Sequence, residues 1–90
     1  MKYRSRTEIT AQILAVALGG VTKTKIMYGA FLSYAQLQEY LAALLENNLL
    51  TYEAKSGILK TTEKGHRFLK ITEELGRLAQ PVIEGRIRKN

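Results

Sequence analysis

The chain has 90 residues, of which 46% are hydrophobic and 24% charged, a composition typical of one small folded domain. It has no cysteine, no aspartate and a single histidine. These absences exclude disulfides, thiolate zinc sites and a Ser-His-Asp triad. We therefore expect a protein without enzyme activity, metal or cofactor. The longest apolar runs, such as 13–18, are too short to span a membrane, and the basic N-terminus lacks the apolar segment of a secretory signal.

Positive charge dominates the sequence and is clustered. Fourteen Lys and Arg against eight acidic residues give a formal net charge of +6. The clusters lie at 2–6, 23–25, 55–70 and 86–89. For any one cluster, ordinary solubilising charge is an equally good interpretation. Four separated clusters in so small a chain instead favour binding to a polyanion.

Three helices are predicted in the first half of the chain. Ser-x-x-Glu at 5–8 and Ser-x-x-Gln at 33–36 have the form of capping boxes, and apolar residues at helical spacing follow each of them. The predicted helices run from Ser5 to Gly19-Gly20, from about Thr22 to Gly29, and over 33–47. Because so short a turn separates the second and third helices, we expect them to cross steeply, as in a helix-turn-helix.

After Asn48 the apolar period changes from that of a helix to that of a strand. Strands at 49–53 and 58–61, joined by a turn, predict a β-hairpin, or wing, whose tip is 54–57. Thr62 is the predicted N-cap of a last helix. We expect Pro81 to end or kink this helix near Gln80, because proline cannot donate a backbone hydrogen bond.

The last helix carries more apolar side chains than the rest of this small domain can cover. Its heptad stripe consists of Phe68, Ile71, Leu75, Leu78 and Val82. We expect Ile71, Leu75, Leu78 and Val82 to form the dimerisation surface of a homodimer; a frayed amphipathic tail is the alternative, given Gly76 and Pro81. Residues 1–61 are then a winged helix-turn-helix core with a basic arm, and 62–90 a helix that is partly core and partly dimerisation surface. The predicted fold class is mainly α with a β-hairpin, a winged helix-turn-helix with a C-terminal dimerisation helix.

The segment KTKIMYGAFLSYAQLQEYL, residues 23–41, resembles one family in particular. It is similar to the small basic archaeal winged-helix proteins that bind DNA as dimers, some of them associated with chromatin. The matching residues are Lys23, Thr24, Ile26, Met27, Tyr28, Gly29, Ala30, Leu32, Ser33, Tyr34, Ala35 and Tyr40, with a weaker match at 62–65. The resemblance implies a winged helix, binding to double-stranded DNA, and dimerisation through the last helix.

Candidate DNA contacts fall on the recognition helix 33–47, the second helix, the wing 54–57 and the N-terminal arm. Gln36 faces outward on a helical wheel and can pair with adenine through two hydrogen bonds. Capping is the first role predicted for Ser33, and packing the first role for Tyr34, with a phosphate contact second for each. The tyrosines are expected to be half-buried. The predicted DNA-binding residues are Arg4, Arg6, Lys23, Lys25, Ser33, Tyr34, Gln36, Tyr40, Lys55 and Ser56.

Together these features predict a double-stranded DNA-binding protein that acts as a transcription regulator or chromatin component. We expect it in the cytoplasm, associated with the nucleoid, with no small-molecule ligand and no membrane contact. The alternative is a winged-helix module for protein–protein interaction without direct DNA binding. The absence of basic residues from the recognition helix favours this alternative.

Overall fold

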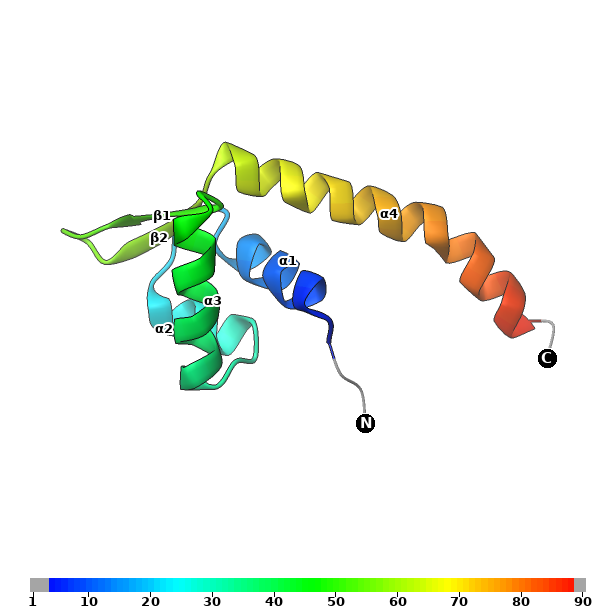
Figure 1. Cartoon of the computed structure of the whole chain (residues 1–90), viewed down its shortest axis with the longest axis horizontal. Coiled ribbons are helices and arrows are strands. Elements are labelled where there is room, and N and C mark those ends of the chain that lie inside the picture. The colour runs from blue at the N-terminus through cyan, green and yellow to red at the C-terminus, as the bar shows by residue number, and fades with distance from the viewer. Residues whose placement is uncertain (1–3, 89–90) are drawn as a thin grey trace.

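The computed structural model describes residues 4–88, and the side chains of residues 4–79. Its elements are α1 (Arg6–Val16), α2 (Lys23–Gly29), α3 (Tyr34–Glu46), β1 (Leu50–Glu53), β2 (Ile58–Thr61) and α4 (Glu63–Arg88). In Figure 1 the first three helices and the hairpin gather at one end, and α4 projects away from them. The order of elements confirms the predicted fold class, mainly α with a β-hairpin.

The capping box predicted at the start of α1 is present. The Ser5 hydroxyl accepts a hydrogen bond from the Glu8 backbone N–H at 3.0 Å, and the Glu8 carboxylate accepts one from the Ser5 N–H at 2.7 Å. The pKa of Glu8 lies below its ordinary value. The main cause is the hydrogen bond from the Ser5 backbone, and the second is the hydrogen bond with the Ser5 side chain. The bond to the Glu8 carboxylate therefore contributes fully above the ordinary pKa of glutamate and is lost as the pH falls through the lowered pKa, whereas the bond from the Glu8 N–H to the Ser5 hydroxyl does not depend on this protonation.

The hydrophobic core lies between α1, α2, α3 and the base of the hairpin. Its buried apolar residues are Ile9, Ile13, Leu14, Ala17, Ile26, Ala30, Leu32, Leu37, Leu41, Leu44, Leu50 and Leu59. On α3, the buried residues Leu37, Leu41 and Leu44 follow the spacing of one helical face. This packing fixes which sides of α3 remain available to a partner.

The hairpin is attached to the core at its base. β1 and β2 pair antiparallel, with Tyr52 opposite Leu59, and Val21 bridges to Leu59 on the other edge of β2. The Thr61 hydroxyl donates a hydrogen bond to the Leu14 carbonyl of α1 at 2.7 Å. The base of the wing is therefore anchored, and its tip at 54–57 extends away from the core (Figure 1).

The first turns of α4 pack closely on the hairpin and α1. The Thr62 hydroxyl oxygen accepts from the Gly65 N–H at 3.0 Å, as predicted for an N-cap, and donates to the Asn48 carbonyl at 2.7 Å. Gly65 is buried, and a Cβ atom there would lie 2.5 Å from the Leu49 carbonyl oxygen. The close approach of α4 to the chain before β1 therefore requires glycine at this position.

Pro81 was predicted to end or kink the last helix near Gln80; it does not end the helix, because α4 continues to Arg88. Gly76 does not interrupt it either. A proline removes one backbone hydrogen bond, and bending of the helix relieves the contact between its ring and the preceding turn. Figure 1 shows the C-terminal half of α4 running in a different direction from its first half. A helix of 26 residues is about 39 Å long, so most of α4 extends beyond the core.

Candidate nucleic-acid interface

The N-terminal end of α2 presents two lysines to solvent. Thr22 caps this helix, and its hydroxyl accepts from the Lys25 backbone N–H at 3.3 Å. Lys23 and Lys25 are both exposed. Over residues 4–79, whose side chains are described, the one ion pair joins Arg77 to Glu74 at 2.8 Å. The charges of Lys23 and Lys25 are therefore not neutralised by any carboxylate within this range.

The first turn of α3 uses two of the predicted site residues to cap the helix. The Ser33 hydroxyl accepts from the Gln36 backbone N–H at 3.2 Å, and the Gln36 side-chain oxygen accepts from the Ser33 N–H at 3.0 Å. The capping role predicted for Ser33 is confirmed. This arrangement ties the Gln36 side-chain oxygen, which a bidentate pair with adenine would need, to the Ser33 backbone.

A second glutamine of α3, Gln38, is absent from the predicted set and lines the same groove as Lys23. The Gln38 side-chain amide donates a hydrogen bond to the Tyr34 hydroxyl at 3.1 Å. Both side chains are exposed, Tyr34 to 65%. The predicted packing role of Tyr34 is therefore wrong, because its side chain lies on a face of α3 that is exposed to solvent. The spacing of four residues between Tyr34 and Gln38 is the signal that could have identified the pair.

A groove runs between α3 and the hairpin, with the start of α2 at its rim. It is lined by Lys23, Gln38, Leu41, Ala42, Leu45, Tyr52 and Leu59. The structure thus brings Lys23 together with Gln38, although the two are fifteen positions apart in the sequence. The floor is apolar and the rim carries a lysine, an amide and a phenol, which are groups that bind phosphates and base edges.

The wing tip is a four-residue turn between β1 and β2. Gly57 adopts a positive φ of 72° there, which glycine accommodates without strain. Lys55 is exposed, whereas the Ser56 hydroxyl donates to the Glu53 carboxylate. The sequence reasoning missed Glu53, which the spacing of three residues to Ser56 could have indicated. The tip therefore presents one lysine, and its predicted serine is paired with a neighbouring carboxylate.

The helices α2 and α3 are joined by a short turn and are followed by a two-stranded wing, which is a recognisable arrangement. A family model described as winged helix-turn-helix matches residues 3–80 of the chain. The chain belongs to the winged helix-turn-helix family. The match covers every element from α1 to most of α4 and confirms the fold that the sequence indicated.

One solved structure is closely similar to this winged helix. It is the crystal structure of Sso10a-2, a DNA-binding protein from Sulfolobus solfataricus, with 25% sequence identity and a TM-score of 0.83. The similarity covers 94% of this chain and 92% of that one. The resemblance to small archaeal winged-helix proteins is thereby confirmed. No curated protein sequence gives a significant match.

The N-terminal arm of the winged helix is placed differently from the prediction. The Arg4 guanidinium donates to the Gln12 side chain and the Ala30 carbonyl, each at 2.7 Å, and to the Phe31 carbonyl at 3.0 Å. Phe31 has a positive φ of 54°, which a residue other than glycine seldom adopts. Arg4 is therefore engaged in holding the turn between α2 and α3, and these bonds use three of the five N–H donors of its guanidinium group.

Two other predicted residues lie on the opposite flank of α3 from Lys23. Arg6 and Tyr40 line a second, shallow groove between α1 and α3, together with Thr10, Glu39, Ala43 and Leu44. Tyr40 is half-buried against the core, as expected, whereas Tyr28, Tyr34 and Tyr52 are exposed, contrary to the prediction, and Tyr3 lies outside the described residues. The predicted DNA-binding set is thus divided between the two flanks of α3.

The outward ridge of α3, whose residues also form the edges of both grooves, consists of small and acidic side chains. Its exposed residues are Ala35, Glu39, Ala42, Ala43 and Glu46, and α3 contains no Lys or Arg. The positive side chains that could bind phosphates, Lys23 and Arg6, line the grooves beside this ridge, and the ridge itself has no positive charge. Among the described residues, no group of acidic or histidine side chains could hold a metal ion, and no helix is long and apolar enough to cross a membrane.

Proposed function

We propose that this winged helix binds double-stranded DNA through the face formed by α2, the Gln38 side of α3 and the wing. The observation that carries the proposal is the groove between α3 and the hairpin, with the unpaired Lys23 at its rim. Lys25 and Lys55 add exposed positive charge on the neighbouring elements. Sso10a-2, which shares the fold over 94% of this chain, is itself a DNA-binding protein.

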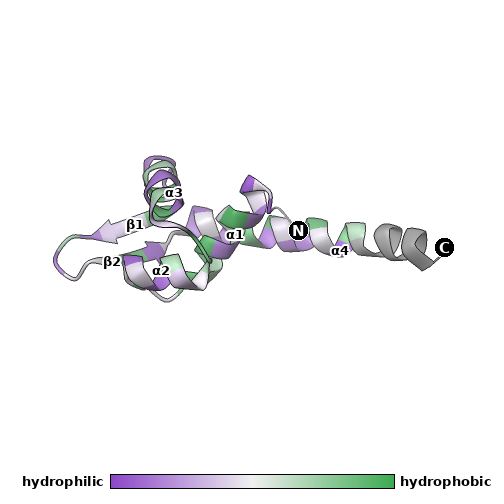
Figure 2. Cartoon of the chain, turned by 90° about the horizontal axis from the view of Figure 1, so that it is seen from below, coloured by the Kyte–Doolittle hydropathy of each residue, from purple (hydrophilic) through white to green (hydrophobic). Residues whose placement is uncertain are grey.

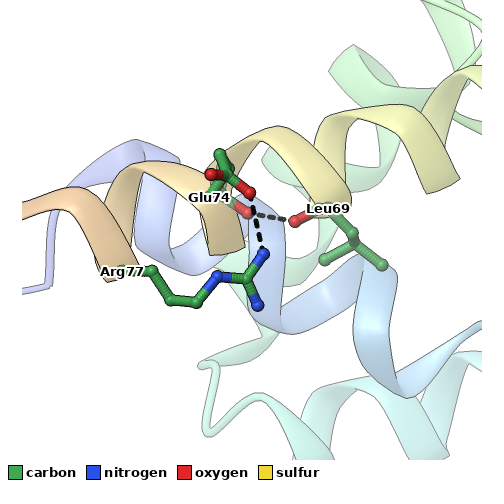
Figure 3. Close-up of polar contacts among 4 residues, drawn as sticks. Leu69, Glu74 and Arg77 are labelled. Carbon is green, nitrogen blue, oxygen red and sulfur yellow. Dashed lines mark hydrogen bonds and ion pairs between the residues drawn. The ribbon is translucent and has the colours of Figure 1, made fainter.

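A homodimer is part of the proposal. Ile71, Leu75 and Leu78 are exposed to 60% or more along one stripe of α4, and Val82 lies outside the described side chains. Figure 2 shows hydrophobic segments recurring along α4 beyond the core. The Arg77–Glu74 pair, seen in Figure 3, is exposed and contributes little stability. A second copy of α4 would remove the apolar stripe from water.

The biological role that follows is a non-enzymatic DNA-binding protein, a transcription regulator or chromatin component associated with the nucleoid in the cytoplasm. A second candidate is a protein–protein interaction module. The acidic, small-residue ridge of α3 favours this second function, because Glu39 and Glu46 would repel phosphates in a deep major-groove contact.

We expect wild-type protein to retard duplex DNA of mixed sequence, with an affinity that falls steeply as salt rises. Changing both Lys23 and Lys25 to Ala should weaken binding to all sequences about equally. It should also reduce the slope of log K against log salt by roughly 2 for each bound protomer, because each phosphate contact releases about one counterion. Fluorescence anisotropy at several salt concentrations measures both quantities.

The matched control removes the same charge from α4. Changing Lys70 and Arg77 to Ala should leave the salt slope close to that of the wild type, because both side chains lie outside the proposed face. Equal effects of the two double substitutions would mean that net charge, rather than the α2 face, determines binding. A wild-type protein without measurable DNA binding at low salt would favour the protein–protein alternative.

A further inference from the structure

We propose that Gln38, held in place by Tyr34, is the base-reading residue of this winged helix and that it selects adenine. The inference rests on the proposed DNA binding and names the group that gives it sequence preference. It differs from the interpretation of the sequence, which gave that role to Gln36. The observation that separates the two glutamines is the partner of each side chain.

The side-chain oxygen of Gln36 is already bound to the backbone at the start of α3. It accepts the Ser33 backbone N–H at 3.0 Å, and this bond is one half of the α3 capping box. Turning the amide toward a base would break the capping box and leave the Ser33 N–H without its partner. The structure thus employs Gln36 in starting the helix.

Gln38 has the opposite arrangement. One N–H of its amide donates to the Tyr34 hydroxyl at 3.1 Å, while its carbonyl oxygen and second N–H have no partner among the side chains and backbone of residues 4–79. The Tyr34 ring is exposed at the start of α3, so the hydroxyl orients the amide without burying it. An oriented amide loses less rotamer freedom on binding than a free one.

The free donor and acceptor of Gln38 match the major-groove edge of adenine. The carbonyl oxygen can accept from the N6 amino group while the N–H donates to N7, and this is the pairing that glutamine makes with adenine. Guanine offers two acceptors at the same edge, so the Gln38 carbonyl would face another oxygen there. The pair with adenine uses the carbonyl oxygen and the N–H on the same side of the amide, so the bond to Tyr34 persists in the complex when it is made by the other N–H.

The position of Gln38 supports the same assignment. It lines the groove whose rim carries Lys23, whereas the other flank of α3 places Glu39 beside Arg6. A phosphate bound by Lys23 would bring the neighbouring base edges to the Gln38 flank. Gln38 is thus on the side of α3 where the charge attracts DNA, and Tyr34 is its positioning residue.

The test is selection of binding sites from a random duplex pool at one fixed salt concentration, followed by affinity measurements on the selected and on mixed-sequence DNA. We expect the wild type to enrich adenine at one position of each half-site. Gln38→Ala should bind the selected, adenine-containing site about 5- to 150-fold more weakly than the wild type does. It should also bind all four bases equally well at the position of that adenine. Gln38→Glu should replace adenine by cytosine, whose N4 amino group donates to a carboxylate.

Two further variants separate base reading from a structural effect. Tyr34→Phe keeps the ring and removes the hydroxyl, so it should weaken the adenine preference while affinity for mixed-sequence DNA and the melting temperature stay unchanged. Gln36→Ala should lower the melting temperature and leave the base preference intact. Loss of the adenine preference in Gln36→Ala but not in Gln38→Ala would overturn the inference.

The outcomes also distinguish this inference from the proposed function. The wild type could bind DNA from the pool without enriching any base, or could enrich the same base as the Gln38→Ala variant. Either result would show that Gln38 does not read a base, while the proposed DNA binding would stand. If the wild type retains no DNA from the pool at low salt, both the inference and the proposed function are overturned.

Discussion

Replacing Leu75 by glutamate is expected to convert the homodimer into a folded monomer with at least tenfold weaker DNA binding. Leu75 is 60% exposed at the centre of the α4 stripe, between Ile71 and Leu78. Full burial of each such side chain stabilises association by roughly 1.5–3 kcal/mol, and a carboxylate in the seam would replace this gain with a desolvation cost. Because two linked binding modules can gain 10²–10⁴ in avidity, a monomer should bind DNA much more weakly.

Sedimentation at micromolar concentration and DNA affinity are the two measurements for this variant. Gly76→Glu is the matched control, because it adds the same charge to the neighbouring residue, where a side chain would have open space. We expect the control to remain dimeric. A wild-type protein that sediments as a monomer at this concentration would contradict the proposed dimer, as would a Leu75→Glu protein that remains dimeric.

Gly65→Ala is expected to destabilise the fold by about 2 kcal/mol, within the 1–3 kcal/mol typical of overpacking. The new methyl group would lie 2.5 Å from the Leu49 carbonyl oxygen and 2.7 Å from the Thr61 side chain, so α4 or the hairpin would have to move. For a domain of this size each kcal/mol corresponds to about 4–8 °C in melting temperature. Thermal and urea unfolding, followed by circular dichroism, measure the loss.

The same helix supplies the control for this substitution. Gly76→Ala adds the same methyl group where nothing lies within 4 Å. We expect it to leave stability unchanged or to raise it by up to about 1 kcal/mol, because alanine has the higher helix propensity. Equal stability of Gly65→Ala and the wild type would mean that α4 does not pack against Leu49 as described.

The helix starts and the hairpin were predictable because local chemistry determines them. Ser5, Thr22 and Ser33 each cap a helix through a hydrogen bond to a backbone N–H three residues ahead, so the signal lies within four residues of sequence. The hairpin follows from a change of apolar period and a turn at Gly57. Neither feature depends on contacts with distant parts of the chain.

The roles of Arg4, Tyr34 and Gln36 were not predictable, because tertiary placement decides each of them. Two of the three acceptors of Arg4 lie 26 and 27 residues away in the sequence. A helical wheel shows the angle of Tyr34 around α3, but not that its side chain is left exposed to solvent. The wheel also shows Gln36 facing outward and cannot show that its amide turns back to the Ser33 backbone.

Mapping the DNA contact on the protein by nuclear magnetic resonance tests the central claim most directly. ¹⁵N-labelled wild-type protein would be titrated with a mixed-sequence duplex at low salt, and the amide shift of every residue followed. We expect the largest changes at the start of α2, on the Gln38 flank of α3 and at the wing tip 54–57, with little change along α4 beyond Ile71. Largest changes along α4, or on the Arg6 flank of α3, would contradict the proposed interface.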